Sequence, residues 1–436
     1  MGESGIRGNK PRRSQGFLKI KPSKGFSSEL YMSIDLPFHK SWFDDDEINE
    51  VVETLKSGWL TTGPRTKRFE DDFKQYIGCD YAIGLNSCTA GLHLALATQG
   101  FAPGDEVITT PFTFVSTNHS IVYENLKPCF ADIDDSLNLN PQSVRDKISN
   151  NTKAIMFVGI GGNTKNLIEI INIARENNLI IILDAAQMSG SYIDSRHVGF
   201  DVDVSVFSFQ AVKNLPTADS GMICFNKSDE DKRARQLSWL GINKDTFARS
   251  NNGYYKWDYT VNEVGYKYHG NSIMAALGIV GLRYLDEDNQ YRRDLVSRYI
   301  NNLNGKVDYI EHDSDQTSRH IFQVVVECRD KLIDYLSANN IFPGVHYRQN
   351  TDYEVFYTKS KLPKSEYFSK HILSLPLHLD LNFKDRYDIY SPIDFRNITD
   401  YMQFHRPQFQ DEIESNIYDI IWGAFRILEG TELKNN

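Results

Sequence analysis

The sequence predicts an α/β protein with a mostly parallel sheet sandwiched by helices, followed by a smaller C-terminal α+β domain. Between residues 80 and 225, short apolar runs alternate with helical patterns of about ten to fifteen residues. This alternation indicates βαβ units, which place consecutive strands parallel to one another. After residue 290 the pattern changes to "HIFQVVVEC", a short strand, and "DKLIDYLSANN", a helix, which favours a second and smaller unit.

The elements can be assigned in chain order. A helix is predicted after the acidic residues 44–46, which suit a helix N-terminus, because four apolar residues follow at helical spacing: Ile48, Val51, Val52 and Leu55. Strands are predicted at 80–85, 105–110, 127–133, 153–160, 179–186, 203–209 and 221–226. Helices are predicted between them at 88–100, 114–125, 140–150 and 164–177. The helix at 140–150 begins with Asn140 as N-cap and Pro141 in its first turn.

The chain length of 436 residues exceeds the size of a single hydrophobic core. We expect a large α/β domain at 33–290 and a small α+β domain at 291–385. Residues 1–32 are rich in Gly, Ser and basic residues and predict a disordered tail, with a nucleic-acid-binding arm as an alternative. Residues 386–436 form an extension with a predicted amphipathic helix, marked by Ile413, Ile417, Ile420, Ile421, Ala424, Phe425 and Leu428.

Composition excludes several classes of protein. The formal net charge of -10 disfavours binding to a phosphate backbone. No apolar run approaches the roughly 20 residues that cross a bilayer, and the N-terminus has no apolar signal segment. The five cysteines are scattered without a CxxC pair, which argues against a disulfide framework or a zinc site. We therefore expect a cytoplasmic protein with reduced thiols.

Lys213 stands between two apolar runs in "SVFSFQAVKNLPTADSGMICF", residues 205–225. A lysine in such a loop is usually a solvated charge, because lysines are rarely buried without a partner. The alternative is a catalytic amine that forms a Schiff base with an aldehyde. The choice between them depends on which other residues end near Lys213.

Two further signals lie at predicted strand ends. Asp184 ends the apolar run "LIIILD", where an acid either caps a helix or binds a ligand. Beside a pyridine ring, a carboxylate in this position keeps the ring nitrogen protonated. The segment "NSCTAG" places Cys88 and Thr89 at a helix start, whose free N–H groups suit a phosphate, although a plain Ser or Thr N-cap explains the same residues.

Three more residues extend the pattern. Phe114, near the end of another predicted strand, can stack on an aromatic ring or pack in the core. Ser208 lies five residues before Lys213, where its hydroxyl can reach the same phosphate, and Gln187 can lie near the ring. Each signal is weak alone. Together, a phosphate cradle, an acid, an aromatic ring and a lysine at the ends of different strands fit pyridoxal 5'-phosphate.

Eight segments, in their order and spacing, resemble the DegT/DnrJ/StrS family of nucleotide-sugar aminotransferases, which have the aspartate aminotransferase fold (fold type I). The resemblance runs from residue 33 to residue 385. The matching segments are "GWLTTGPRTKRFEDDF", "NSCTAGLHLAL", "GDEVITTPFTFVST", "ILDAAQ", "FSFQAVKNL", "GYKYHGNSIMAALG", "VHY" and "LSLPLH".

The resemblance implies a role for each matching residue. Lys213 is expected to be the Schiff-base lysine and proton shuttle, and Asp184 to pair with the pyridine nitrogen. Gln187 and Phe114 are expected at the two faces of the ring. The phosphate is expected to be held by Ser208 and by the backbone of Cys88 and Thr89. The segment "GYKYHG" is expected to come from the other subunit of a homodimer, where His269 can donate to the phosphate.

The sequence departs from the family pattern at four places. Cys88 stands where the family usually has Gly, and His269 where it often has Asn or Arg. "QMSGS" replaces a commoner Gln-Ala-His-Gly, and "TADSGM" replaces a commoner Gly-Glu-Gly-Gly stretch. The last two changes are expected to reshape the substrate pocket.

The implied activity is transfer of an amino group from L-glutamate to a nucleotide-linked keto sugar, for the biosynthesis of surface polysaccharide or of natural-product sugars. Two alternatives remain open from sequence. Some relatives are sugar dehydratases with the same cofactor, but they carry His in place of the lysine, and this chain has Lys213. The other alternative is a non-catalytic regulatory or scaffold protein on the same fold.

Overall fold

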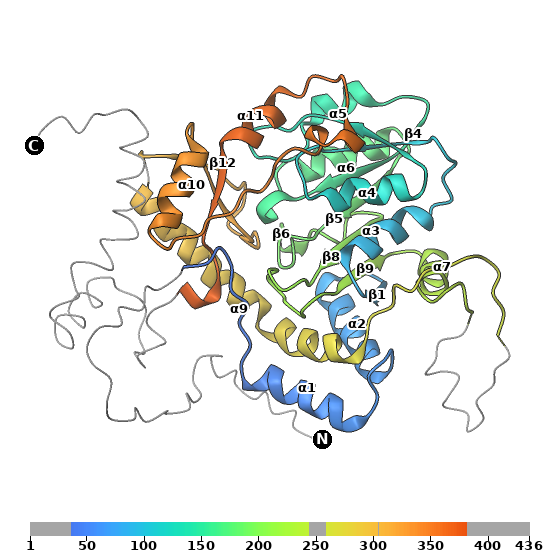
Figure 1. Ribbon diagram of the computed structural model, residues 1–436. Coiled ribbons are helices and arrows are strands. Elements are labelled where there is room, and N and C mark those ends of the chain that lie inside the picture. Colours follow the sequence, from blue (N-terminus) through green and yellow to red (C-terminus); the bar gives the residue numbers. More distant parts are fainter. Residues whose placement is uncertain (1–35, 244–258, 304, 382–436) are drawn as a thin grey trace, which may run out of the picture.

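The structure is a computed structural model that describes residues 36–243, 259–303 and 305–381 (Figure 1). The expected tail at 1–32 and the expected extension at 386–436 lie outside the described residues, as do the last residues of the expected small domain.

The centre of the large domain is a seven-stranded sheet with the order β1-β9-β8-β5-β4-β2-β3. Neighbouring strands are parallel except β9, which is antiparallel to both β1 and β8. This confirms the predicted α/β class with a mostly parallel sheet. No helix separates β8 from β9, so β9 returns antiparallel beside β8, and the loop between them carries Lys213. The strands are β1 (Tyr81–Leu85), β2 (Glu106–Thr109), β3 (Lys127–Phe130), β4 (Thr152–Val158), β5 (Ile180–Asp184), β8 (Val204–Ser208) and β9 (Gly221–Phe225).

Helices cover both faces of the sheet and form two hydrophobic cores. One core packs against α2 (Pro64–Ile77), α5 (Pro141–Lys147), α6 (Leu167–Glu176) and the first part of α9 (Ser272–Leu303). The other packs against α3 (Cys88–Ala97), α4 (Val115–Tyr123) and α7 (Ser228–Ser238). Along β5, Ile181 and Leu183 belong to the first core and Ile182 to the second, because successive side chains of a strand point to opposite faces. A small hairpin, β6 (Tyr192–Ile193) and β7 (Arg196–His197), lies outside the sheet.

The small domain is joined to the large one by α9, a helix of 32 residues that runs from beneath the large sheet to the small domain (Figure 1). The expected boundary at 290–291 falls inside this helix. The small domain contains an antiparallel sheet of β10 (Asp308–Tyr309), β11 (Phe322–Val325) and β12 (Ile372–Leu375), with α10 (Arg329–Ala338) and α11 (Pro363–His371). Short 3-10 turns occur at Ile160–Gly162, Asn350–Asp352, Glu354–Phe356 and Leu379–Leu381.

The predicted first helix is present as α1 (Asp45–Ser57). Its N-cap is Asp44, whose side chain accepts from the Asp46 N–H at 3.0 Å while Glu47 Oε2 accepts from the Asp44 N–H at 3.1 Å. The apolar residues that predicted this helix are largely at the surface of the single chain. Ile48 and Leu55 are 53% and 51% exposed to solvent in the single chain. An apolar helix face therefore lacks a cover within the described part of the chain.

Among the described residues, no helix has both the length and the apolar character needed to cross a membrane. The same residues contain no group of three or more His, Cys, Asp or Glu side chains arranged to hold a metal ion. All five cysteines lie within the described ranges and are free thiols.

Candidate active site

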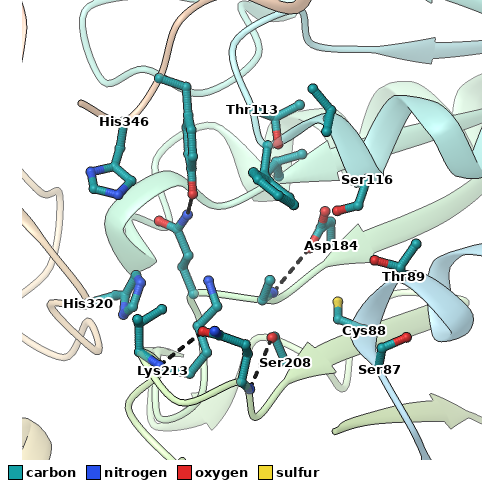
Figure 2. A pocket seen from close by; sticks show the side chains of 18 of the residues that line it. Ser87, Cys88, Thr89, Thr113, Ser116, Asp184, Ser208, Lys213, His320 and His346 are labelled. Atoms are coloured by element: carbon teal, nitrogen blue, oxygen red, sulfur yellow. Dashed lines mark hydrogen bonds between the residues drawn. The ribbon is translucent and has the colours of Figure 1, made fainter. Parts of the chain in front are cut away.

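A cavity of about 780 Å³ opens at the carboxyl ends of the central strands (Figure 2). Both domains contribute to its wall. The large domain supplies the ends of β5 and β8, the starts of α3 and α4, and the loop after β8, while the small domain supplies His320 and part of the segment 345–353. Seven of the eight residues predicted for the site line this cavity: Cys88, Thr89, Phe114, Asp184, Gln187, Ser208 and Lys213.

Lys213 lies in the loop between β8 and β9, with its backbone N–H bonded to the Gln210 carbonyl at 2.8 Å. Its side chain is half-buried and borders the cavity. Burial lowers the pKa of the Lys213 amine, and the nearby Cys88 and Asp184 partly oppose this shift. A lysine with a lowered pKa has more of the neutral amine that acts as a nucleophile or base.

Asp184 is the last residue of β5 and is buried, with 4% of its surface exposed. Its Oδ2 accepts a hydrogen bond from Thr117 Oγ1 at 2.8 Å, and its Oδ1 accepts one from the Ala186 N–H at 3.2 Å. Burial raises the pKa of the Asp184 carboxyl, while these bonds and the charge of Lys213 lower it. The side chain is thus fixed in orientation and borders the cavity.

The start of α3 is where the phosphate cradle is expected. Ser87 is the N-cap, and its Oγ accepts from the Ala90 N–H at 3.1 Å. Cys88 and Thr89 follow as the first two helical residues, whose N–H groups have no acceptor within the helix. The N-cap interpretation of "NSCTAG" is confirmed by Ser87, and the phosphate interpretation stays a prediction that the cap does not oppose, since the cap and the free N–H groups belong to different residues. Burial raises the pKa of the Cys88 thiol, so it adds no negative charge beside a phosphate.

Gly221 allows this cradle to approach the sheet. It is the first residue of β9 and pairs with Ser208 on β8. A Cβ atom on Gly221 would lie 2.7 Å from the Cys88 nitrogen, which is too close for any side chain. The close approach keeps the Ser208 hydroxyl and the first N–H groups of α3 on the same cavity wall.

Phe114 and Gln187 border the same cavity in different ways. Phe114 precedes α4 and keeps 60% exposure, so its ring is free to cover a planar ligand. Gln187 is bonded at both ends of its amide. Its Oε1 accepts from the Gly161 N–H at 2.6 Å, and its Nε2 donates to the Tyr347 hydroxyl at 2.7 Å. The flat face of the Gln187 amide can therefore contact a ring. The same side chain holds Tyr347 in the cavity wall.

His269 does not border this cavity. It borders a second cavity of about 910 Å³, and its ring lies edge-on to Trp239 with the centroids 4.2 Å apart. His269 Nδ1 is 2.8 Å from the Gly270 carbonyl, which can only accept, so Nδ1 carries the hydrogen. Nε2 of the neutral ring is then an acceptor, and it can donate to a phosphate only when the imidazole is charged. Burial lowers the pKa of His269, which opposes that charge. Its contact with a phosphate remains a prediction that requires a second subunit.

The sequence interpretation missed two side chains of the site. Thr117, which orients Asp184, lies on α4, and nothing in "FVSTNHS" separates it from an ordinary helical threonine. His320 borders the cavity from the small domain, directly before the apolar segment that forms β11. Only the packing of the small domain on the large one brings His320 to the cavity.

The arrangement fits pyridoxal phosphate. The first N–H groups of α3 and the Ser208 hydroxyl suit its phosphate, a buried carboxylate suits its ring nitrogen, and a lysine of lowered pKa suits its aldehyde. Cys88 and Thr89 lie on the opposite side of the cavity from His320 and His346 (Figure 2). A ligand with a phosphate at one end and a reactive carbon nearer Lys213 matches this arrangement.

Comparison with known proteins gives the same assignment. The model of the DegT/DnrJ/EryC1/StrS aminotransferase family matches residues 42–393. The spore coat polysaccharide biosynthesis protein SpsC of Bacillus subtilis is 34% identical over 371 residues, which cover 81% of this chain and 95% of SpsC.

Two solved structures are also similar to this chain. The sugar aminotransferase CalS13 of Micromonospora echinospora has 29% identity and a TM-score of 0.72, covering 80% of this chain and 97% of CalS13. The PLP form of Spr1654 of Streptococcus pneumoniae has 26% identity and a TM-score of 0.76, covering 90% of this chain and 99% of Spr1654. With a match over most of its length, the chain belongs to the DegT/DnrJ/EryC1/StrS aminotransferase family, whose members are pyridoxal phosphate-dependent sugar aminotransferases.

Proposed function

We propose that this enzyme moves an amino group from L-glutamate to a nucleotide-linked keto sugar. The observation that carries the proposal is the convergence of Lys213, Asp184 and the start of α3 on one cavity at the strand ends. The relatives add support, because CalS13 is titled a sugar aminotransferase and SpsC is named for spore coat polysaccharide biosynthesis. We assign the product to the biosynthesis of surface polysaccharide or of natural-product sugars, in the cytoplasm.

Bound pyridoxal phosphate supplies an aldehyde and a ring that withdraws electrons from the carbon bearing the amino group. Lys213 Nζ would hold the aldehyde end of the cofactor, and as a free amine it would take the proton from the amino-bearing carbon of the donor. The lowered pKa of Lys213 suits this work, since the free amine must be neutral to accept that proton.

The other side chains of the site would hold and orient the cofactor. Asp184 would keep the ring nitrogen protonated, and Thr117 would fix the carboxylate for that contact through its bond to Oδ2. The phosphate would be held by the Ser208 hydroxyl and by the N–H groups of Cys88 and Thr89. Phe114 and Gln187 would cover the two faces of the ring.

We further propose that the enzyme is a homodimer with shared active sites. Ile48, Val52 and Leu55 form an exposed apolar face on α1, which a second subunit would cover. His269 borders a second cavity of its own chain, so its contact with a phosphate would require the site of a neighbouring subunit.

The test uses the full chain loaded with pyridoxal phosphate. It is incubated with L-glutamate and a panel of nucleotide-linked keto sugars, and the sugar products are identified by mass. We expect one or more aminated sugars with L-glutamate, and none from the Lys213→Ala variant. A product that has only lost water would favour the dehydratase alternative. A protein that binds no cofactor, seen as the lack of yellow colour after reconstitution, would favour the scaffold alternative.

A further inference from the structure

The hydrogen bonds around His320 fix which of its ring nitrogens carries the hydrogen. Asn214 Nδ2 donates to the Ser318 carbonyl at 2.8 Å and to Asn289 Oδ1 at 2.6 Å. The nitrogen end of the Asn214 amide is thereby defined, and its Oδ1 faces His320 Nδ1 at 2.8 Å. Because Oδ1 can only accept, His320 Nδ1 must donate. In the neutral ring, Nε2 then presents a lone pair.

The ring stays neutral in this environment. Burial lowers the pKa of His320 well below its ordinary value, and the charges of Lys213 and Arg292 lower it further, with smaller effects from His39 and His346. His320 is 5% exposed and is one of the residues that line the cavity. The fixed tautomer therefore leaves a hydrogen-bond acceptor, and not a donor, at Nε2 of a residue in the cavity wall.

His320 and Lys213 line the same cavity and lie on the same side of it (Figure 2). Among the residues that the structure describes, neither Nε2 nor Nζ has a hydrogen-bond partner. The two residues are also linked through the chain, because Asn214 directly follows Lys213. The bond that orients the His320 ring thus also ties the small domain to the lysine loop.

We propose that His320 is a positioning residue for Lys213, with His320 Nε2 accepting a hydrogen bond from Lys213 Nζ when the free amine is protonated. The inference rests on the proposed role of Lys213. The bond would stabilise the ammonium that Lys213 becomes on taking the proton of the donor, and it would keep Nζ within the cavity. The proton stays on the lysine, and no covalent bond is made or broken.

Two variants separate this role from a structural one. In His320→Asn the side-chain amide can replace Nδ1 and keep the bond to Asn214, but nothing replaces Nε2. In His320→Gln the amide oxygen can replace Nε2 as an acceptor, but the bond to Asn214 is lost. The first readout needs no cofactor. The pH dependence of Lys213 acetylation by acetic anhydride is followed by peptide mass spectrometry in the cofactor-free protein.

We expect His320→Asn to lower the midpoint of this profile by at least about half a pH unit, because the ammonium loses its acceptor, and to reduce kcat about tenfold with little change in the KM for the sugar. His320→Gln should keep a midpoint near that of the wild type. The proposal is overturned if His320→Asn behaves as wild type and His320→Gln does not, since that pattern marks a purely structural bond.

A second measurement uses the wild-type protein and so does not depend on the folding of a variant. Nitrogen NMR of the 15N-histidine-labelled, cofactor-free protein should show His320 with its hydrogen on Nδ1. A hydrogen on Nε2 would exclude the proposed acceptor. Failure of the proposed function has a different signature, namely the absence of an aminated sugar when the wild-type protein is incubated with L-glutamate and the sugar panel.

Discussion

Thr117 donates a hydrogen bond of 2.8 Å from its hydroxyl to Oδ2 of Asp184, and so joins α4 to the end of β5. The Ala186 N–H holds the other carboxylate oxygen at 3.2 Å. A buried carboxylate is costly unless it is hydrogen-bonded, so these two bonds partly offset the rise that burial causes in the pKa of Asp184. The orientation of the acid is thus set by the helix that begins beside Phe114.

Thr117→Val should weaken the binding of pyridoxal phosphate while leaving the fold intact. Valine has nearly the shape of threonine but no hydroxyl, so Asp184 loses one bond worth about 1.5 kcal/mol, or about tenfold in affinity. The affinity is measured by titrating the cofactor-free protein with pyridoxal phosphate and following absorbance. Thr117→Ser keeps the hydroxyl and serves as the control. Equal affinities for the valine and serine variants would show that the bond does not orient the acid.

Asp184→Asn should still bind the cofactor but turn over about a hundredfold more slowly. The amide preserves the size of the side chain but lacks the charge that keeps a ring nitrogen protonated. The rate of the first half-reaction is measured with L-glutamate alone, by the change in the cofactor absorbance. A near-normal rate would mean that Asp184 serves only to hold Thr117 and the Ala186 backbone in place.

Lys213→Ala should abolish amino transfer, with a loss of at least about a thousandfold, and leave the far-ultraviolet circular dichroism unchanged. Because the Lys213 side chain is half-buried and forms no hydrogen bond within the described residues, its removal deletes the amine without breaking a side-chain hydrogen bond. Product formation from the sugar panel is the readout. Turnover that persists in this variant would remove Lys213 from the mechanism.

The extent to which the sequence predicted this site follows from where each residue lies in the fold. Asp184, Ser208 and Cys88 could be predicted to meet, because they end or follow strands of one sheet, and the ends of parallel strands converge at one sheet edge. His320 could not be predicted, because it reaches the cavity only through the packing of the two domains. The antiparallel direction of β9 could not be predicted from the residues of β9 either, since it depends on the loop that precedes this strand.

At one position in the loop that carries Lys213, replacing the native residue with glycine should increase the stability of the protein. Ala218 has φ of 79°, a left-handed conformation that costs a side chain about 1 kcal/mol, and its carbonyl accepts from the Ala211 N–H at 2.8 Å. It lies in "TADSGM", where the family more often has Gly-Glu-Gly-Gly. Ala218→Gly should therefore stabilise the cofactor-free protein by about 0.5 kcal/mol, after the entropy of glycine in the unfolded chain is subtracted.

Urea denaturation measures this change. Ala211→Gly is the matched control, since Ala211 lies at the other end of the same bond and does not have a positive φ. The control should lose stability while Ala218→Gly gains it. A loss of stability in both variants would show that the left-handed conformation at Ala218 is not strained.

The exposed face of α1 leads to a prediction about assembly. Ile48 and Leu55 are 53% and 51% exposed in the single chain, so replacing both with glutamate should not disturb the core of that chain. If a second subunit covers this face, two buried charges without partners would disfavour the dimer strongly. Ile48→Glu/Leu55→Glu should therefore sediment as a monomer and lose activity, while Glu53→Gln, on the same helix, should remain a dimer. A double variant that stays dimeric would place the interface elsewhere, and the exposed face of α1 would no longer support shared active sites.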